Sequence, residues 1–168
     1  MSKKKAPVSK TGIHGFYRIQ LKENGEIVGD SGWKGPNMVT NVGIQNGIMN
    51  LIAGTTGSFQ VGAMAVGTGT APASNATSLD GEYGGTAIRK AIGTVATTQR
   101  TASDAVATLQ FQCKWDSSLN TASANVANIG LFDVSTAAGN MLCGNTFASS
   151  KWDTNQDLYA SYELRFDF

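Results

Sequence analysis

The stretch LYASYELRFDF, residues 158–168, decides the fold that this sequence predicts. Its even positions are all apolar, and the odd positions between them are mostly polar: Tyr159, Ser161, Glu163, Arg165 and Asp167. An apolar residue at every second position is typical of a β-strand with one face in a core and the other in water. We therefore expect the chain to end in a long, half-buried strand.

A second stretch, residues 105–115, repeats this pattern. Its apolar side chains fall on alternate positions: Ala105, Ala107, Leu109, Phe111, Cys113 and Trp115. Strands that are apolar on one face favour an antiparallel sheet, since parallel strands are usually buried on both faces. Such a sheet must cover its apolar face, most simply with a second sheet. The sequence therefore predicts a mainly β protein, an antiparallel β-sandwich of the jelly-roll or Greek-key kind, with Cys113 and Trp115 in its core.

Turn signals divide the rest of the chain into shorter elements. Asn24-Gly25 predicts a type I′ turn in a hairpin over residues 15–28, because both central residues of that turn need a positive φ. Trp33 is an expected core anchor, and residues 35–37, Gly-Pro-Asn, are an expected turn. Four further strands are expected at residues 59–66, 87–98, 126–134 and 141–147. A long polar loop is expected at residues 74–85.

Residues 42–52 hold the helix that the sequence predicts. Its apolar residues fall at helical spacing and would share one face: Ile44, Ile48, Leu51 and Ile52. Asn41 is the expected N-cap, and Gly54 the residue just past the end. Gly43 and Gly47 weaken an isolated helix, so we expect it to be supported by packing across an open end of the sandwich.

A chain of 168 residues suits one domain. We expect residues 1–12 to form a basic N-terminal arm and residues 13–168 to form a single β-sandwich domain. Charged residues make up only 15% of the chain, below the usual quarter. That composition fits a β-protein with many turns, or one whose surface is largely covered by other subunits.

The basic charge is concentrated in the arm. The first ten residues hold no acid and four lysines: Lys3, Lys4, Lys5 and Lys10. The rest of the chain has a net charge of −3, which does not suit a strongly basic nucleic-acid-binding domain. No apolar run approaches the length of about 20 residues that a membrane helix needs, and no signal-peptide core follows the lysines. The arm is either a frayed terminus or a contact for a neighbouring subunit or an acidic surface.

Residue types that catalysis and metal binding need are sparse. His14 is the single histidine, and with two distant cysteines it makes a poor zinc set. Asp153 and Asp157 could pair as a glycosidase requires, although a solvated loop explains them better. Residues 67–69, Gly-Thr-Gly, lack the further glycine or the Gly-Lys-Ser/Thr of phosphate-binding loops, so a tight turn is expected there. We expect no catalytic residue, no cofactor and no bound metal.

Two aromatic residues are candidates for an exposed contact with a partner. Trp152 lies in an otherwise polar stretch, and Tyr83 lies in the long loop. Together with Trp33 and Trp115 they could form a carbohydrate platform. Because Trp115 falls on an inward face of its strand, core packing is the better expectation for it.

Three stretches of glycine turns beside apolar strands follow one another along the chain. The first holds Gly15-Phe16-Tyr17, Asn24-Gly25, Gly32-Trp33, Asn37 and Asn41-Val42-Gly43; the second is VGTGTAPA at residues 66–73 with Leu79; the third is Ile129-Gly130-Leu131-Phe132, Gly139 and Met141-Leu142. In this order they resemble the small β-sandwich virion structural proteins of tailed bacteriophages, of the capsid decoration (cement) or tail and fibre attachment type. Asn128 departs from that pattern, in which an acid would precede Ile129, and this puts an ion pair at that strand end in doubt.

The resemblance implies a structural role in a virion, without catalysis, for a protein assembled in the host cytoplasm. The leading hypothesis is a capsid decoration or cement protein that binds the outside of the head shell through the arm lysines. The alternative is a tail, collar or fibre-base component whose long loop and Trp152 contact a host receptor. The partners are then the major capsid protein, or tail and portal-proximal virion proteins, with further copies of the chain, guessed as a trimer. No specific nucleic acid and no membrane are expected.

Overall fold

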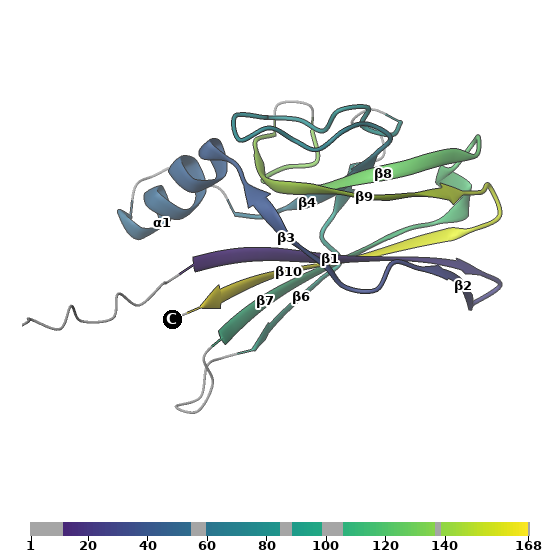
Figure 1. The fold of residues 1–168 in the computed structure, drawn as a ribbon, viewed down its shortest axis with the longest axis horizontal. Helices are drawn as coiled ribbons and strands as arrows, with labels where there is room; N and C mark the ends of the chain where they lie inside the picture. The colour runs from purple at the N-terminus through teal and green to yellow at the C-terminus, as the bar shows by residue number, and fades with distance from the viewer. Residues whose placement is uncertain (1–11, 55–59, 85–88, 99–105, 137–138, 168) are drawn as a thin grey trace, which may run out of the picture.

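The computed structural model describes residues 12–54, 60–84, 89–98, 106–136 and 139–167. In these ranges the chain forms two antiparallel sheets, with a helical segment at one end (Figure 1). The sheets face each other across a shared core, so the expected β-sandwich is confirmed.

Most of the described elements correspond to expected ones with shifted ends. The exceptions are a strand at residues 34–39 and a short helix at 117–119, which were not expected, and the strand expected at residues 87–98, whose described part is two strands. The strands are β1 (Gly12–Glu23), β2 (Glu26–Asp30), β3 (Lys34–Val39), β4 (Ala63–Gly67), β5 (Lys90–Ala91), β6 (Thr94–Thr98), β7 (Val106–Trp115), β8 (Ala124–Phe132), β9 (Met141–Trp152) and β10 (Asp157–Asp167). The helices are the π-helix η1 (Gly43–Met49), α1 (Asn50–Ile52) and the 3₁₀-helix η3 (Ser117–Leu119). Within the described ranges, no helix combines the length and the hydropathy that a membrane crossing requires.

The last strand of the chain lies in the middle of the first sheet, which runs β1–β10–β7–β6 with β2 beside β1. Tyr162 of β10 is opposite Tyr17 of β1 on one side and Phe111 of β7 on the other. Leu158, Tyr162 and Leu164 are buried, as the alternation of residues 158–168 predicts. The first sheet is therefore built around β10.

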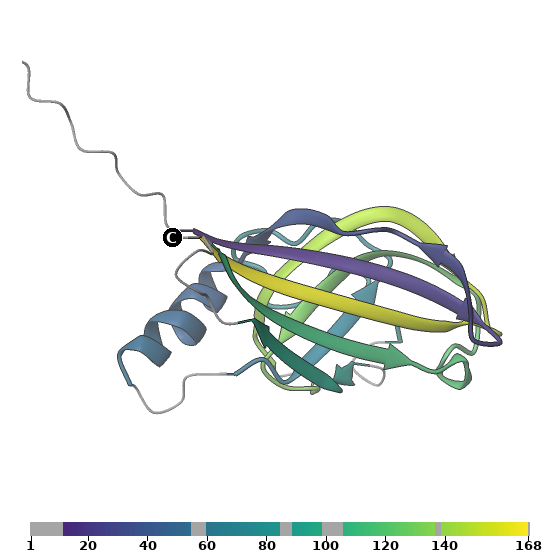
Figure 2. The same ribbon diagram turned by 90° about the horizontal axis from the view of Figure 1, so that it is seen from below.

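The second sheet runs β3–β9–β8–β4–β5 and is connected to the first along both sides. On one side β3 pairs first with β1, at Lys34 and Asn37, and then with β9, at Val39. On the other side the chain passes from β5 to β6, and the N–H of Gly93 donates to the carbonyl of Gln112 in β7 (3.0 Å). Figure 1 shows the two layers one above the other, and in Figure 2 the strands of one lie across those of the other.

Large aromatic side chains fill the space between the sheets. The largest fully buried ones there are Trp115, Trp152, Tyr17 and Tyr162, whereas Phe132 packs in a second buried cluster with Leu79 and Met141. Full burial of a large apolar side chain contributes about 1.5–3 kcal/mol, so this layer dominates the packing energy. Trp115 and its neighbour two residues earlier, Cys113, lie inside as expected.

The first hairpin confirms one prediction and corrects two. Asn24 and Gly25 have φ values of 50° and 87°, as a type I′ turn requires. Trp33 is 38% exposed and does not anchor the core, because it lies in the short segment that runs along the edge of β1 from β2 to β3. Residues 35–37 are part of β3 and form no separate turn.

A buried ion pair that no sequence pattern predicts connects three loops. The Arg89 guanidinium binds both carboxylate oxygens of Glu82, at 3.0 and 2.8 Å, and donates to the carbonyl of Thr136 at 2.7 Å. It also lies 3.7 Å from the centre of the Phe132 ring. Its side chain is 1% exposed and that of Glu82 is 10% exposed, so each charge depends on the other.

Glu82→Ala should lower the free energy of unfolding by about 3–5 kcal/mol, because it leaves the Arg89 charge buried without its partner. Urea denaturation at neutral pH measures this change. Arg18→Gln is the matched control, since it breaks a partly exposed pair with Asp30 and should shift the midpoint far less. Equal shifts for the two variants would contradict the assigned role of the buried pair.

Both cysteines are free and buried, Cys113 in β7 and Cys143 in β9. Burial raises the pKa of the Cys113 thiol to about 11 and that of the Cys143 thiol to about 12, because a thiolate there would lose its hydration. Reactivity requires the thiolate, so both side chains should be inert in the folded state.

Neither thiol should react with an aromatic disulfide reagent in the native protein at pH 8, and both should react after unfolding. An unfolded thiol titrates near pH 9, whereas the native thiols keep their protons up to about pH 11 and 12. The unfolded state therefore binds fewer protons above pH 9, and the free energy of unfolding should fall from pH 9 to 12. Cys143→Ala should make this fall shallower in urea titrations; an unchanged slope would contradict it.

Candidate functional site

The helical segment is anchored by Thr40, which directly follows β3. Thr40 is fully buried; its hydroxyl donates to the carbonyl of Met141 in β9 (2.5 Å) and accepts from the N–H of Gly43 (2.9 Å). Thr40 therefore has the capping role that the sequence assigns to Asn41. Gly54 follows the segment with a φ of 63°, in the left-handed conformation expected there.

The segment turns its glycines toward β9. Gly43 and Gly47 are buried, and a Cβ on Gly43 would lie 2.2 Å from the carbonyl oxygen of Leu142. Glycine at this position permits the close approach of the two backbones. Ile44 and Ile52 are 42% and 81% exposed, so the shared apolar face is not the face that packs on the sandwich. The glycines, which lower helix propensity, are the reason that this segment can pack on β9.

An apolar cleft of about 570 Å³ opens between the helical segment and the ends of β7 and β10. Ile48 and Ile52 form one wall, and Leu109, Leu164 and Phe166 lie on the other. Exposed apolar side chains lie on the helical segment and on β6 at this end of the sandwich, and we call them the apolar end: Ile44, Met49, Ile52 and Val95. Exposed apolar patches of this kind commonly mark interaction sites.

The first described residue of the chain lies at this same end. Gly12 of β1 pairs with Asp167 of β10, next to Phe166 in the cleft wall, and Figure 2 shows both strand ends beside the helical segment. The arm residues that the sequence singles out precede Gly12 and lie outside the described residues: Lys3, Lys4, Lys5 and Lys10. They are therefore attached at the apolar end.

The long loop is held against the end of β4 by Asp80 and Asn128. The N–H of Gly69 donates to the carbonyl of Asp80 (3.1 Å), and that of Thr70 to its carboxylate (2.9 Å). The buried amide of Asn128 donates to the carbonyls of Thr70 (3.1 Å) and Asp80 (2.8 Å). These backbone amides are used within the protein. Gly67 still belongs to β4, and Thr68 and Gly69 bend alongside Asp80 and Gly81, so the expected tight turn at residues 67–69 is not formed. A carboxylate at position 128 could not donate these bonds, which explains the amide there.

The expectation that Trp152 is exposed is wrong. Its side chain is fully buried, and its indole N–H donates to the carbonyl of Gln156 (2.7 Å). Tyr83 is half-buried, with its ring 5.4 Å from that of Trp152 and its hydroxyl bonded to the carbonyl of Ala122 (2.7 Å). The polar stretch is the end of β9, where Trp152 pairs with Ala124 and points inward.

Asp153 and Asp157 are each bound to a lysine. Lys151 lies 2.7 Å from the Asp153 carboxylate, and Lys114 lies 2.8 Å from that of Asp157. Each lysine lowers the pKa of its partner. The general acid of a glycosidase needs a raised pKa, so this pair does not suit that chemistry.

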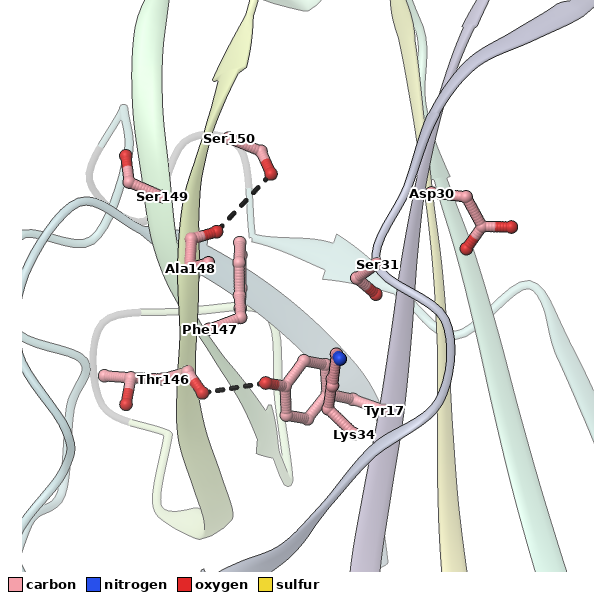
Figure 3. A pocket seen from close by; sticks show the side chains of 9 residues that line it. All are labelled: Tyr17, Asp30, Ser31, Lys34, Thr146, Phe147, Ala148, Ser149 and Ser150. Atoms are coloured by element: carbon pink, nitrogen blue, oxygen red, sulfur yellow. Dashed lines mark hydrogen bonds between the residues drawn. The ribbon is translucent and has the colours of Figure 1, made fainter.

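A second cavity, of about 660 Å³, lies between β9 and the segment that links β2 to β3 (Figure 3). We call it the β9 groove, and its lining residues are Tyr17, Asp30, Ser31, Lys34, Thr146, Phe147, Ala148, Ser149 and Ser150. Among the described residues, β3 pairs with β9 only at Cys143 and Gly144. Beyond that point the edge of β9 faces the groove.

The groove has an aromatic floor. The Tyr17 hydroxyl donates to the carbonyl of Thr146 (2.7 Å), and the Phe147 ring lies 5.6 Å from the Tyr17 ring. Figure 3 shows Phe147 extending from β9 into the groove. Because Tyr17 is buried and Phe147 only partly so, Phe147 is the aromatic surface that a ligand could reach.

Of the two charged side chains that line the groove, Asp30 has hydrogen-bond partners within the protein and Lys34 has no ion-pair partner among the described residues. Asp30 accepts hydrogen bonds from Arg18 (2.9 Å), Gln20 (3.0 Å) and the N–H of Gly32 (2.8 Å). Its contact with Arg18 holds the pKa of the Asp30 carboxyl well below its usual range. Lys34 is exposed and forms no ion pair with any residue that the structure describes. The groove therefore offers an unpaired cation.

The β9 groove is not among the sites that the sequence predicts. The signal that could have found it is at residues 145–150, Asn-Thr-Phe-Ala-Ser-Ser, where the alternation of β9 gives way to small polar residues around one phenylalanine. Comparisons with protein-family models, curated proteins and solved structures found no match for this chain. Function must therefore be inferred from the geometry.

Gly43→Val should lower the free energy of unfolding by about 1–3 kcal/mol, because the added side chain collides with the Leu142 carbonyl and moves the helical segment. Gln45→Ala, at an exposed position of the same segment, is the control and should change stability little. Denaturant titration measures both. Equal stability of the two variants would contradict the packing described for the glycine face.

Proposed function

We propose that this chain is a non-enzymatic structural protein of a bacteriophage virion, most simply a decoration or cement protein on the outside of the head shell. The observation that supports this best is the attachment of the lysine-rich arm at the apolar end. The cationic segment is thus joined to the chain at the end of the β-sandwich that carries the exposed apolar side chains. Together they suit a broad partner surface that is acidic and partly apolar.

The division of charge between arm and body supports this role. The arm holds four of the 13 basic residues, and the rest of the chain has a net charge of −3. A basic arm attracts the acidic surface of a shell over roughly one Debye length, about 8–10 Å. The weakly charged body allows copies to pack side by side with little repulsion. Assembly as a homo-oligomer, guessed as a trimer, belongs to the same proposal.

Burial of the apolar end would supply the short-range part of the binding energy. Removing apolar surface from water contributes about 25 cal/mol per Å², and Met49 and Ile52 are 57% and 81% exposed in the single chain. Many copies with modest interfaces would reinforce a shell, since each one ties neighbouring shell subunits together.

The alternative is a tail, collar or fibre-base component. The β9 groove favours it, because the groove lies along the side of the sandwich, and a recognition site there would stay accessible after attachment through the apolar end. Such a protein would be present in few copies per particle.

The copy number of the chain in particles of the virus that encodes it separates these roles. Quantitative gel densitometry should give a fixed molar ratio of this chain to the major capsid protein. That ratio should correspond to copies over the whole shell. A few copies per particle would support the tail alternative. Absence of the chain from purified particles would overturn both.

Deletion of residues 1–10 and, separately, Ile52→Ser should each reduce binding to shells that lack the chain. Lys151→Ser removes an exposed lysine far from the apolar end in sequence and is the control, with binding expected to stay near that of the unchanged protein. Thermal unfolding checks that each variant is folded. Full occupancy by the deletion variant would contradict the role of the arm.

A further inference from the structure

We propose that the β9 groove is a binding site for an acidic saccharide, a pyranose ring that carries a carboxylate. Phe147 would stack on the ring, Lys34 would bind the carboxylate, and the edge of β9 would bind hydroxyl groups. This inference stands independently of a place in a virion, since it concerns the isolated chain.

The size and openness of the groove suit such a ligand. Its volume of about 660 Å³ lies within the range typical of small-molecule sites, about 300–1,000 Å³. Figure 3 shows its two walls, β9 on one side and the chain from Asp30 to Lys34 on the other. An oligosaccharide could lie along this opening without entering a closed chamber.

Phe147 provides the apolar contact. One face of a pyranose ring is lined by C–H groups, and burying that face against an aromatic ring removes apolar surface from water on both sides. Phe147 is held in place by Tyr17, whose hydroxyl is itself fixed by the carbonyl of Thr146. The aromatic surface is therefore supported by a fixed neighbour before a ligand binds, and such support lowers the entropy cost of binding.

Lys34 selects for a negative charge. The neighbouring carboxylate, Asp30, is already bound by Arg18, Gln20 and the Gly32 N–H, and in Figure 3 it points away from Phe147. Lys34 extends from the opposite wall beside Tyr17. A ligand carboxylate at Lys34 would make a charge-assisted hydrogen bond without competing for the Asp30 partners. A single unpaired lysine suits one carboxylate better than a polyphosphate.

The polar part of the site comes from the free edge of β9. The carbonyl of Thr146 points into the groove, because it accepts the Tyr17 hydrogen bond. Ser150 follows on the same strand and lines the same cavity, with its hydroxyl 3.4 Å from the carbonyl of Ala148. Sugar hydroxyls both donate and accept, so they can pair with such a mixture of carbonyl and hydroxyl oxygens.

The full chain can be titrated with three defined probes: trigalacturonic acid, a hyaluronan tetrasaccharide and α2,8-linked disialic acid. Calorimetry or NMR shifts should show binding of at least one probe, and weaker binding as salt increases. The methyl ester of the bound probe, which lacks the charge, should bind about tenfold or more weakly, as expected for loss of a charged hydrogen bond. Absence of binding for all three probes would overturn the proposal.

Two variants locate the site. Lys34→Gln should abolish the preference for the acid over its methyl ester, and Phe147→Leu, which keeps the apolar packing against Tyr17, should weaken both about equally. Lys151→Gln, at an exposed lysine of the same strand outside the groove, should leave binding unchanged. If neither Lys34→Gln nor Phe147→Leu changes the affinity of folded protein, the saccharide binds elsewhere and the proposal is wrong.

Discussion

The pairing of β10 between β1 and β7 is the constraint on which the rest of the structure depends. Each edge of β10 is hydrogen-bonded along nearly its whole length, and its inward side chains, such as Tyr162, lie at the centre of the aromatic layer. With this sheet fixed, β3 can leave β1 and join β9 only by crossing between the layers. That crossing opens the β9 groove on one side and delivers Thr40 to the point where the helical segment begins.

Strand periodicity was the part of the fold that could be predicted, because it is a local signal. Alternation over residues 158–168 and 105–115 identifies the two long strands, and Asn24-Gly25 identifies the first turn. The exposure of Trp33 and the burial of Trp152 were beyond such reasoning, since each depends on where a strand ends. The Glu82–Arg89 pair could not be predicted either, because Arg89 also depends on Phe132 and on the Thr136 carbonyl, which come from a distant part of the chain.

The candidate sites, too, depend on contacts between distant parts of the chain that local sequence patterns do not predict. The β9 groove combines Tyr17, Lys34 and Phe147, which are brought together only by the crossing of β3, so the sequence pattern at residues 145–150 could have indicated one wall of the groove but not the site. The helical segment was predicted from its isoleucines, yet its glycines make the contact with β9. Small residues that lower local propensity can thus carry the tertiary contact, and the larger side chains are then left available for a partner.

The central position of β10 also has a consequence for the order of synthesis. A ribosome adds residues from the N-terminus, so β1 and β7 are complete while the strand that must separate them is still unmade. Until residues 157–167 emerge, the two strands that flank β10 each present an unpaired edge and part of an open core, the features that promote aggregation in incomplete sheets. The sheet can close only once residues 157–167 have been made and β10 inserts between β1 and β7. Loss of residues from the end of β10 should therefore disturb the middle of the first sheet, where β10 lies, more than the edges of that sheet.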